Sequence, residues 1–300
     1  MRLDDYRESD NVEQQRSGGS GFGGFGGGGG LGLLFGLIAS RFGIGGIVVL
    51  VLGMMVFGFN PFGGTSSGPK PANVVQESAQ QICAADAAHL FSCRVLANTE
   101  DTWGRIFQAQ GQRYAPPRLS FYSSTGQSGC GAAQSAMGPF YCPTDQRIYL
   151  DPQFFDELQT RFNAAGDFAQ AYVIAHEVGH HIQYLTGIAD RVRREQQSAG
   201  EVGANALQVR MELQADCYAG VWAANAKDAR GAPAMEAGDA EEGLRAATAI
   251  GDDTLQRSAG RTPVPDSFTH GTSAERVAWL KRGLESGDPA RCDTFLGPIG

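Results

Sequence analysis

The clearest hydrophobic pattern in the chain runs through residues 167–185. Apolar side chains recur there at steps of three and four, the spacing of one buried face of an α-helix. They are Phe168, Ala171, Ala175, Val178, Ile182 and Leu185. Asp167 followed by Gln170 resembles an N-cap pair, and Gly187 suits a C-terminal stop. The pattern therefore predicts one amphipathic helix that ends near Gly187.

A second helix is predicted over residues 205–226. Most of its surface is apolar, through Leu207, Met211, Leu213, Tyr218, Val221 and Trp222. Between Arg210 and Lys227 the only charged residues are Glu212 and Asp216, which share a face because they are four apart. A carboxylate among apolar side chains is costly without a cation or a hydrogen-bond partner. These two carboxylates therefore mark a position where a partner is expected.

Shorter patterns complete the prediction of the fold. Helices are expected over residues 74–110, over residues 237–249 and from about residue 272 through Leu284. Short apolar, aromatic or β-branched runs separated by Gly, Ser and Pro predict a small sheet from residues 119–122, 138–142 and 147–150. The chain is therefore expected to have an α+β fold that is predominantly helical.

The first 72 residues have a different character. Residues 1–30 are polar and then almost all Gly with Phe, which predicts a tail without fixed structure. Residues 42–59 carry no charge, and residues 31–39 extend this apolar run, so residues 31–59 are predicted to be a transmembrane helix across a bilayer core of about 30 Å. A buried helix of a soluble domain is the alternative. Residues 60–72 are predicted to be a linker, and residues 73–300 the main domain.

The charges predict the orientation of this anchor. Arg2, Arg7, Arg16 and Arg41 precede the apolar run, whereas Lys70 is the first basic residue after it. The positive-inside tendency then leaves the N-terminus in the cytoplasm and the main domain in the periplasm or outside the cell, on a single-pass inner-membrane protein.

The net charge is −8 and no basic run occurs, so nucleic acid is not expected as a partner. The oligomeric state is left open.

The cysteines agree with export. All six follow the predicted anchor: Cys83, Cys93, Cys130, Cys142, Cys217 and Cys292. An even number in an exported domain favours disulfides. The simplest pairing joins residues 83 with 93 and 130 with 142, which leaves 217 with 292, although other pairings stay open. A metal bound by cysteines is the competing interpretation, but the chain lacks the close CxxC spacing for it.

The predicted helix at residues 167–185 contains the motif HEVGH at residues 176–180. His176 and His180 lie one turn apart, so both imidazoles can reach one zinc ion at about 2.0 to 2.1 Å. Glu177 is rotated by about 100° from His176 and is predicted to be the general base for a water on the metal. The alternative is an ordinary amphipathic helix with two core histidines.

Zinc in a catalytic site needs a third protein ligand. The extended motif with a third His would require Gly at 183 and His at 186, but the chain has Gln183 and Thr186. Glu212 is therefore predicted to be the third Zn²⁺ ligand, and Asp216 the acceptor that orients a ligand imidazole. A structural ion pair between Glu212 and Arg210 is the alternative.

These motifs resemble the putative neutral zinc metallopeptidases of bacterial membranes. The similarity is carried by HEVGHHIQ (residues 176–183) and ELQADCYAGVW (212–222), with RESDNVE (7–13), CPTDQRIYLD (142–151), AIGDD (249–253) and THGTSAER (269–276). It implies a zincin-like fold in which an edge strand at residues 138–141 pairs with an extended substrate, although these residues also suit an ordinary core strand.

A more distant similarity, to membrane-linked peptidases, implies that His270 donates a hydrogen bond to the oxyanion and that Arg276 braces the loop of His270. A helix N-cap at Thr272 or Ser273, preceded by an inert His270, is the alternative.

The function predicted from these features is that of a membrane-anchored zinc endopeptidase acting on a peptide or protein substrate. Glu177 is its base, His270 a second catalytic residue, and His176, His180 and Glu212 its metal ligands. Two alternatives share most of these residues. One is a zinc-containing protein that binds peptides or acts as a chaperone without cutting them, and the other is a zinc amidase for cell-wall peptides.

Overall fold

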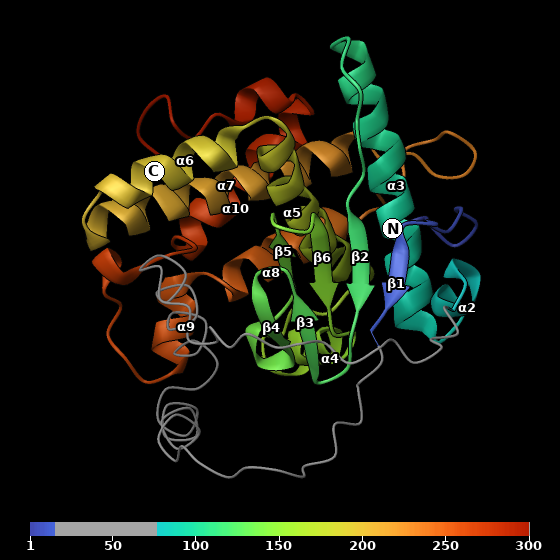
Figure 1. The fold of residues 1–300 in the computed structure, drawn as a ribbon, viewed down its shortest axis with the longest axis horizontal. Helices are drawn as coiled ribbons and strands as arrows, with labels where there is room; N and C mark the ends of the chain where they lie inside the picture. The colour runs from blue at the N-terminus through green and yellow to red at the C-terminus, as the bar shows by residue number, and fades with distance from the viewer. Residues whose placement is uncertain (16–76, 300) are drawn as a thin grey trace, which may run out of the picture.

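The computed structural model describes residues 1–15 and 77–299 (Figure 1). Helices make up most of these two ranges, as predicted. They are α2 (Ala79–Cys83), α3 (Ala87–Ala109), α4 (Gln153–Thr160), α5 (Asp167–Leu185), α6 (Ile188–Ser198), α7 (Glu201–Asn225), α8 (Asp239–Ala249), α9 (Asp252–Ser258) and α10 (Ser273–Ser286), with short 3₁₀ turns at Ser135–Met137, Pro265–Ser267 and Pro289–Cys292.

The strands form a small sheet and a separate hairpin. They are β1 (Val12–Gln14), β2 (Arg118–Phe121), β3 (Thr125–Ser128), β4 (Gly131–Gln134), β5 (Phe140–Cys142) and β6 (Arg147–Leu150). The sheet has the order β1-β2-β6-β5, in which β5 alone is antiparallel to its neighbour, and β3 pairs with β4. Among the described strands β5 is therefore an edge, as predicted for residues 138–141. The α+β prediction is confirmed.

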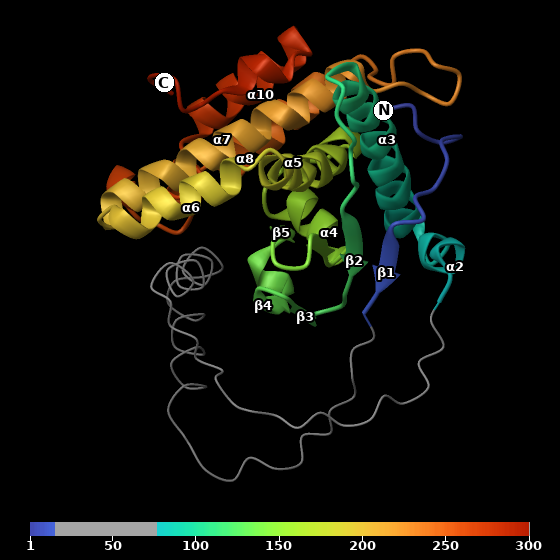
Figure 2. The same cartoon turned by 45° about the horizontal axis from the view of Figure 1, so that its top comes forward.

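Helix α5 is the centre of the packing. It contacts α3, α7 and α8 and also the edge strand β5, while α10 covers the far side of α7. In Figure 2 the helices α10, α7 and α5 follow one another toward the sheet. The apolar face of α5 is buried as its periodicity predicts, because Phe168, Ala171, Ala175, Val178 and Ile182 are all at most 2% exposed. The motif helix is thus held on several sides.

Residues 1–15 depart from the predicted tail. Strand β1 pairs in parallel with β2, and Val12 lies opposite Leu119. Leu3 is buried, and the Arg7 guanidinium binds Glu100 and Asp101 of α3 at 2.8 and 2.7 Å. The prediction that residues 1–30 lack structure is therefore wrong for residues 1–15. The few apolar residues of this segment show no periodicity. The segment is ordered by partners that are distant in sequence, and hydrophobic periodicity does not reveal such partners.

The predicted anchor, residues 31–59, and the linker, residues 60–72, lie outside the described residues. Within residues 1–15 and 77–299, no helix is both long enough and apolar enough to cross a membrane.

Three disulfides join the cysteines in the simplest pairing. They are Cys83–Cys93, Cys130–Cys142 and Cys217–Cys292. The third ties α7 to the turn near the C-terminus, 75 residues later in the chain. The expectation of disulfides is confirmed.

Candidate metal centre

The two histidines of the motif lie next to each other on α5. Their ring centroids are 4.8 Å apart, as expected for side chains one helical turn apart. His176 is 7% exposed, whereas the His180 side chain retains 18% exposure. The two imidazoles therefore form one side of a site that remains open to solvent near His180.

Helix α7 brings Glu212 to these histidines because α5 and α7 approach closely at Gly179. A Cβ atom at this position would lie 2.9 Å from both the Cα and the carbonyl oxygen of Ala215. Only a residue without a side chain fits such an approach. The glycine inside the motif thus allows Glu212, one turn before Asp216, to face His176 and His180.

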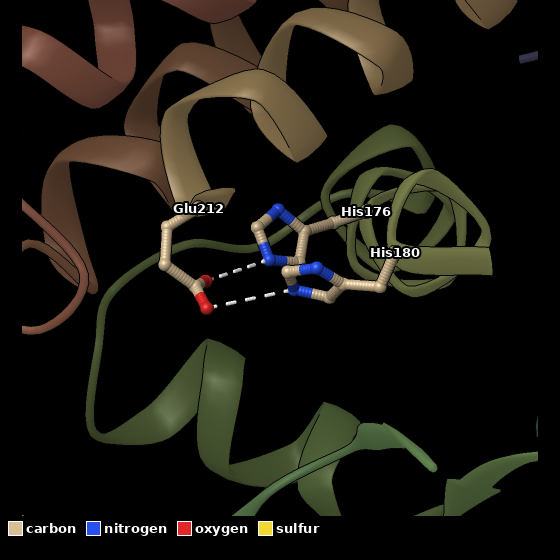
Figure 3. A group of neighbouring side chains, drawn as sticks. All are labelled: His176, His180 and Glu212. Atoms are coloured by element: carbon tan, nitrogen blue, oxygen red, sulfur yellow. Dashed lines mark hydrogen bonds and ion pairs between the residues drawn. The ribbon is translucent and has the colours of Figure 1, made fainter. Parts of the chain in front are cut away.

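The potential ligand atoms converge on one point (Figure 3). Glu212 Oε2 lies 3.1 Å from His176 Nε2, and Glu212 Oε1 lies 3.6 Å from His180 Nε2. Ligand atoms at about 2.1 Å around a tetrahedral zinc ion lie about 3.4 Å from one another. Two imidazoles and one carboxylate with a side open to solvent are also the donors of catalytic zinc sites. The donor set and these separations therefore suit a zinc ion.

Hydrogen bonds to the other ring nitrogens fix the tautomers. His176 Nδ1 lies 2.8 Å from Asp216 Oδ1, and His180 Nδ1 lies 2.9 Å from Gln183 Oε1. The Gln183 amide is itself oriented, because its Nε2 donates to the Met211 carbonyl at 2.7 Å. With Nδ1 of each ring facing these acceptors, Nε2 is the nitrogen of each ring directed at the site. Gln183 lies three residues after His180 in the sequence, but the motif alone predicts no role for it.

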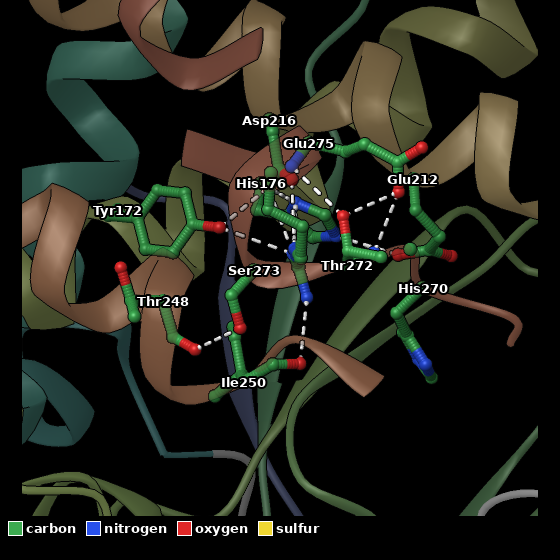
Figure 4. A network of polar contacts seen from close by, with 12 residues as sticks. Tyr172, His176, Glu212, Asp216, Thr248, Ile250, His270, Thr272, Ser273 and Glu275 are labelled. Carbon is green, nitrogen blue, oxygen red and sulfur yellow. Dashed lines mark hydrogen bonds and ion pairs between the residues drawn. The ribbon is translucent and has the colours of Figure 1, made fainter. Parts of the chain in front are cut away.

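Asp216 is the centre of a buried network (Figure 4). Arg276 Nε and Nη2 donate to its two oxygens, both at 2.9 Å, and Tyr172 Oη donates to Oδ1 at 2.6 Å. Burial favours a higher pKa for Asp216, but Arg276 and His176 lower this pKa to about 2. Asp216 is thus an anion beside His176. Arg276, which was predicted to brace the His270 loop, instead forms an ion pair with Asp216.

The charges of the metal ligands complement one another. Burial alone would lower the pKa of His180, but Glu212 raises it to about 9. Burial alone would raise the pKa of Glu212, but the two histidines hold it well below its usual value. Arg210, the alternative partner of Glu212, instead donates to the carbonyls of Thr294 and Gly297. Glu212 therefore belongs to the histidine cluster.

Glu177 lies beside the cluster and not within it. It is 7% exposed, and burial raises the pKa of its carboxyl group although His176 and His180 act to lower it. The backbone of Tyr141 in β5 also acts to lower this pKa. A carboxylate with a raised pKa next to a metal site is suited to accept and return a proton.

The neighbouring His181 fastens β5 to the same helix. Its Nε2 donates to the Ala115 carbonyl at 2.7 Å, and Tyr141 Oη donates to its Nδ1 at 2.9 Å. Burial lowers the pKa of His181 to about 4, so the ring is neutral. Tyr141 is thus bound to α5 through its hydroxyl. The sequence gives no signal for this pair, because the two residues are 40 positions apart.

His270 lies beside Glu212, with which it interacts electrostatically (Figure 4). Its Nδ1 is 3.3 Å from Asp252 Oδ1. The predicted helix cap is also present: Thr272 is the N-cap of α10, with a reciprocal capping box to Glu275. His270 therefore precedes a capped helix and also stands near the potential metal ligands.

Comparison with known proteins agrees with this geometry. The family described as putative neutral zinc metallopeptidase matches residues 1–295. The chain is 49% identical over 298 residues to the uncharacterized protein YpfJ of Escherichia coli K12, covering 98% of this chain and 99% of that protein. It is 42% identical over 220 residues to the uncharacterized protein Rv2575 of Mycobacterium tuberculosis H37Rv, covering 70% of this chain and 73% of that protein. No solved structure matches the chain.

Proposed function

This chain belongs to the putative neutral zinc metallopeptidase family, and from that premise we propose that it is a zinc-dependent endopeptidase. The observation that carries the proposal is the convergence of His176 Nε2, His180 Nε2 and a Glu212 oxygen within 4.8 Å of one another. Bound there, zinc would lower the pKa of a water to about 7 and polarise the scissile carbonyl. The protein must then supply the proton transfers.

Glu177 performs these transfers in the proposed reaction. Its carboxylate takes the proton of the attacking water and then delivers this proton to the leaving amine. Its buried position and raised pKa support that role. Asp216 holds the Nδ1 proton of His176, and Gln183 accepts that of His180, so that both rings keep a lone pair for the metal. His270 supplies a hydrogen bond to the developing oxyanion.

The substrate is an extended peptide that adds to the edge of the sheet at β5. Strand β5 packs against α5, and the Tyr141 backbone influences the pKa of Glu177, so this edge lies near the proposed base. Strand addition places successive peptide bonds along such an edge through main-chain hydrogen bonds. The domain acts in an oxidising compartment outside the cytoplasm, which its three disulfides support.

Replacement of the proposed base separates an enzyme from a protein that only binds peptides. The test uses the full-length protein, because β1 completes the sheet. Glu177→Gln is expected to keep about one zinc per chain and to lose hydrolysis of unfolded proteins by at least ~100-fold, because the metal ligands are intact while proton transfer is lost.

Glu212→Ala is the matched variant and is expected to lose both zinc and hydrolysis. Zinc is measured by atomic absorption, and hydrolysis by the release of new amino groups. Wild-type hydrolysis in Glu177→Gln would assign the activity to other residues. If the wild type binds peptides and zinc without cutting, the proposal of an endopeptidase is wrong.

A further inference from the structure

We propose that Asp252 is a positioning residue that holds the His270 imidazole beside the metal centre, an inference that rests on the proposed peptidase function. Asp252 is the first residue of α9, and it is 9% exposed. Its Oδ2 accepts hydrogen bonds from three successive backbone N–H groups, those of Thr269, His270 and Gly271, at 2.7, 2.6 and 3.1 Å. One carboxylate oxygen therefore shapes the whole turn that carries the histidine.

The other contacts of Asp252 complete this turn. Its own N–H donates to the Gly271 carbonyl at 2.9 Å, which closes the turn onto α9. Its Oδ1 lies 3.3 Å from His270 Nδ1, and Thr269 Oγ1 lies 3.1 Å from the same nitrogen. A carboxylate acceptor favours a proton on Nδ1. Asp252 thus acts on both the backbone and the ring of His270.

The turn is placed against the part of α7 that carries Glu212. A Cβ atom at Gly271 would lie 3.2 Å from Val209 Cγ1 and 3.3 Å from Leu213 Cδ2, residues that flank Glu212 in sequence. The φ angle of Gly271 is +89°, which favours glycine, so the turn can lie this close to the helix. His270 therefore stands over the turn of α7 that supplies the third ligand.

The charges around His270 favour its protonated form. Burial would lower the pKa of His270, but Asp252 and Glu212 raise it, while Arg276 opposes them. An imidazolium has donors at both nitrogens. With Nδ1 held by Asp252, Nε2–H is the donor left for an oxyanion. Without Asp252 the ring of His270 would lose a charged partner. The backbone N–H groups of residues 269–271 would also lose the acceptor that they share.

The adjacent Asp253 provides a matched control. Its Oδ1 accepts from the backbone N–H and the hydroxyl of Ser273 at 2.7 and 2.8 Å, and its Oδ2 pairs with Arg257 at 2.9 Å. These contacts join α9 to the start of α10 without touching His270. Both aspartates occupy the first turn of α9 and anchor a following segment. Only Asp252 reaches the histidine.

The test compares Asp252→Asn and Asp253→Asn in full-length protein with and without His270→Ala. Asparagine keeps the size and an acceptor oxygen but removes the charge. We expect Asp252→Asn to lower kcat roughly 10-fold, part of the ~100-fold loss typical of an oxyanion donor, with KM and zinc content unchanged. In the His270→Ala background the same change is expected to add nothing, because Asp252 acts through His270. Asp253→Asn is expected to leave kcat unchanged in both backgrounds.

A readout independent of hydrolysis comes from nitrogen NMR of the histidine ring. In the wild type His270 Nδ1 is expected to be protonated and hydrogen-bonded to Asp252, whereas Asp252→Asn is expected to weaken this Nδ1–H hydrogen bond and to speed hydrogen exchange at residues 269–271. Equal losses of kcat with and without His270, or an unchanged His270 ring in Asp252→Asn, would overturn the proposal. If the wild type hydrolyses nothing, the peptidase function fails, while the ring measurement still decides the role of Asp252.

Discussion

The two ligand histidines are oriented by acceptors of different strength. His176 Nδ1 faces the anionic Asp216, whereas His180 Nδ1 faces the neutral amide oxygen of Gln183. An acceptor behind a metal-bound imidazole fixes its tautomer, and its loss typically lowers metal affinity about 10- to 100-fold. The two rings thus depend on separate supports, one from α7 and one from α5 itself.

Gln183 offers the cleaner test of this dependence, because Asp216 also pairs with the buried Arg276. We expect Gln183→Ala to weaken zinc binding about 10-fold or more, measured by competition with a chromophoric chelator. Gln197, which is exposed on α6, provides the control variant Gln197→Ala. Equal zinc affinity in the two variants would show that His180 needs no acceptor at Nδ1.

The sequence allowed the ligand residues and one of their supports, Asp216, to be proposed, but not the other supports. His176, His180 and Glu212 were identified because a motif at helical spacing and an isolated carboxylate pattern are local features. Gln183 is also near in sequence, yet its role depends on an amide orientation fixed by Met211 of another helix. Asp252 and His270 are 18 positions apart and meet only through a turn. Such contacts depend on tertiary packing, which hydrophobic periodicity does not describe.

At the scale of elements, α5 and α7 were predictable because their apolar faces are long and regular. Helix α6 was not predicted, because its residues are mostly polar and Val192 is the one buried side chain among them. Strand β1 is three residues long and is paired with a strand more than 100 positions later. The closeness of α5 and α7 at Gly179 could not be predicted either, since it depends on how the two helices cross.

Because α5 and α7 approach closely at Gly179, we expect alanine substitutions at two helical glycines to change the free energy of unfolding in opposite directions. Gly179→Ala would place a Cβ 2.9 Å from the Ala215 backbone, so we expect it to destabilise the fold by about 1 to 3 kcal/mol and to weaken zinc binding. At Gly104 in α3 an added Cβ meets nothing within 4 Å. Gly104→Ala is therefore expected to stabilise the helix by up to about 1 kcal/mol.

Urea denaturation of the two variants measures both effects. Both variants replace glycine by alanine within a helix. The difference between their stabilities therefore excludes the general stabilising effect of alanine in helices. A Gly179→Ala variant as stable as Gly104→Ala, with normal zinc affinity, would mean that α5 and α7 separate at no cost.

At the scale of the whole molecule, the first residues belong to the domain that holds the metal centre. The Met1 amino group lies 2.7 Å from Asp167 Oδ2, at the start of α5, and β1 pairs with β2. The orientation predicted from arginine bias puts residues 1–30 in the cytoplasm and residues 73–300 outside it. Hydrogen bonds between β1 and β2 cannot form across a membrane. A single span that puts these two segments on opposite sides is therefore incompatible with the pairing of β1 with β2.

We accordingly expect both described segments to lie on the same side of any membrane. The native cysteines are all in disulfides, so a single added thiol reports its own location. Asp5→Cys and Gln197→Cys place this thiol at exposed positions near the N-terminus and on α6. In spheroplasts a membrane-impermeant maleimide is expected to label both variants to the same extent, because β1 and the helical domain fold together. Labelling of Gln197→Cys alone would show that β1 is separated from the sheet in the cell and would restore the orientation inferred from the arginines.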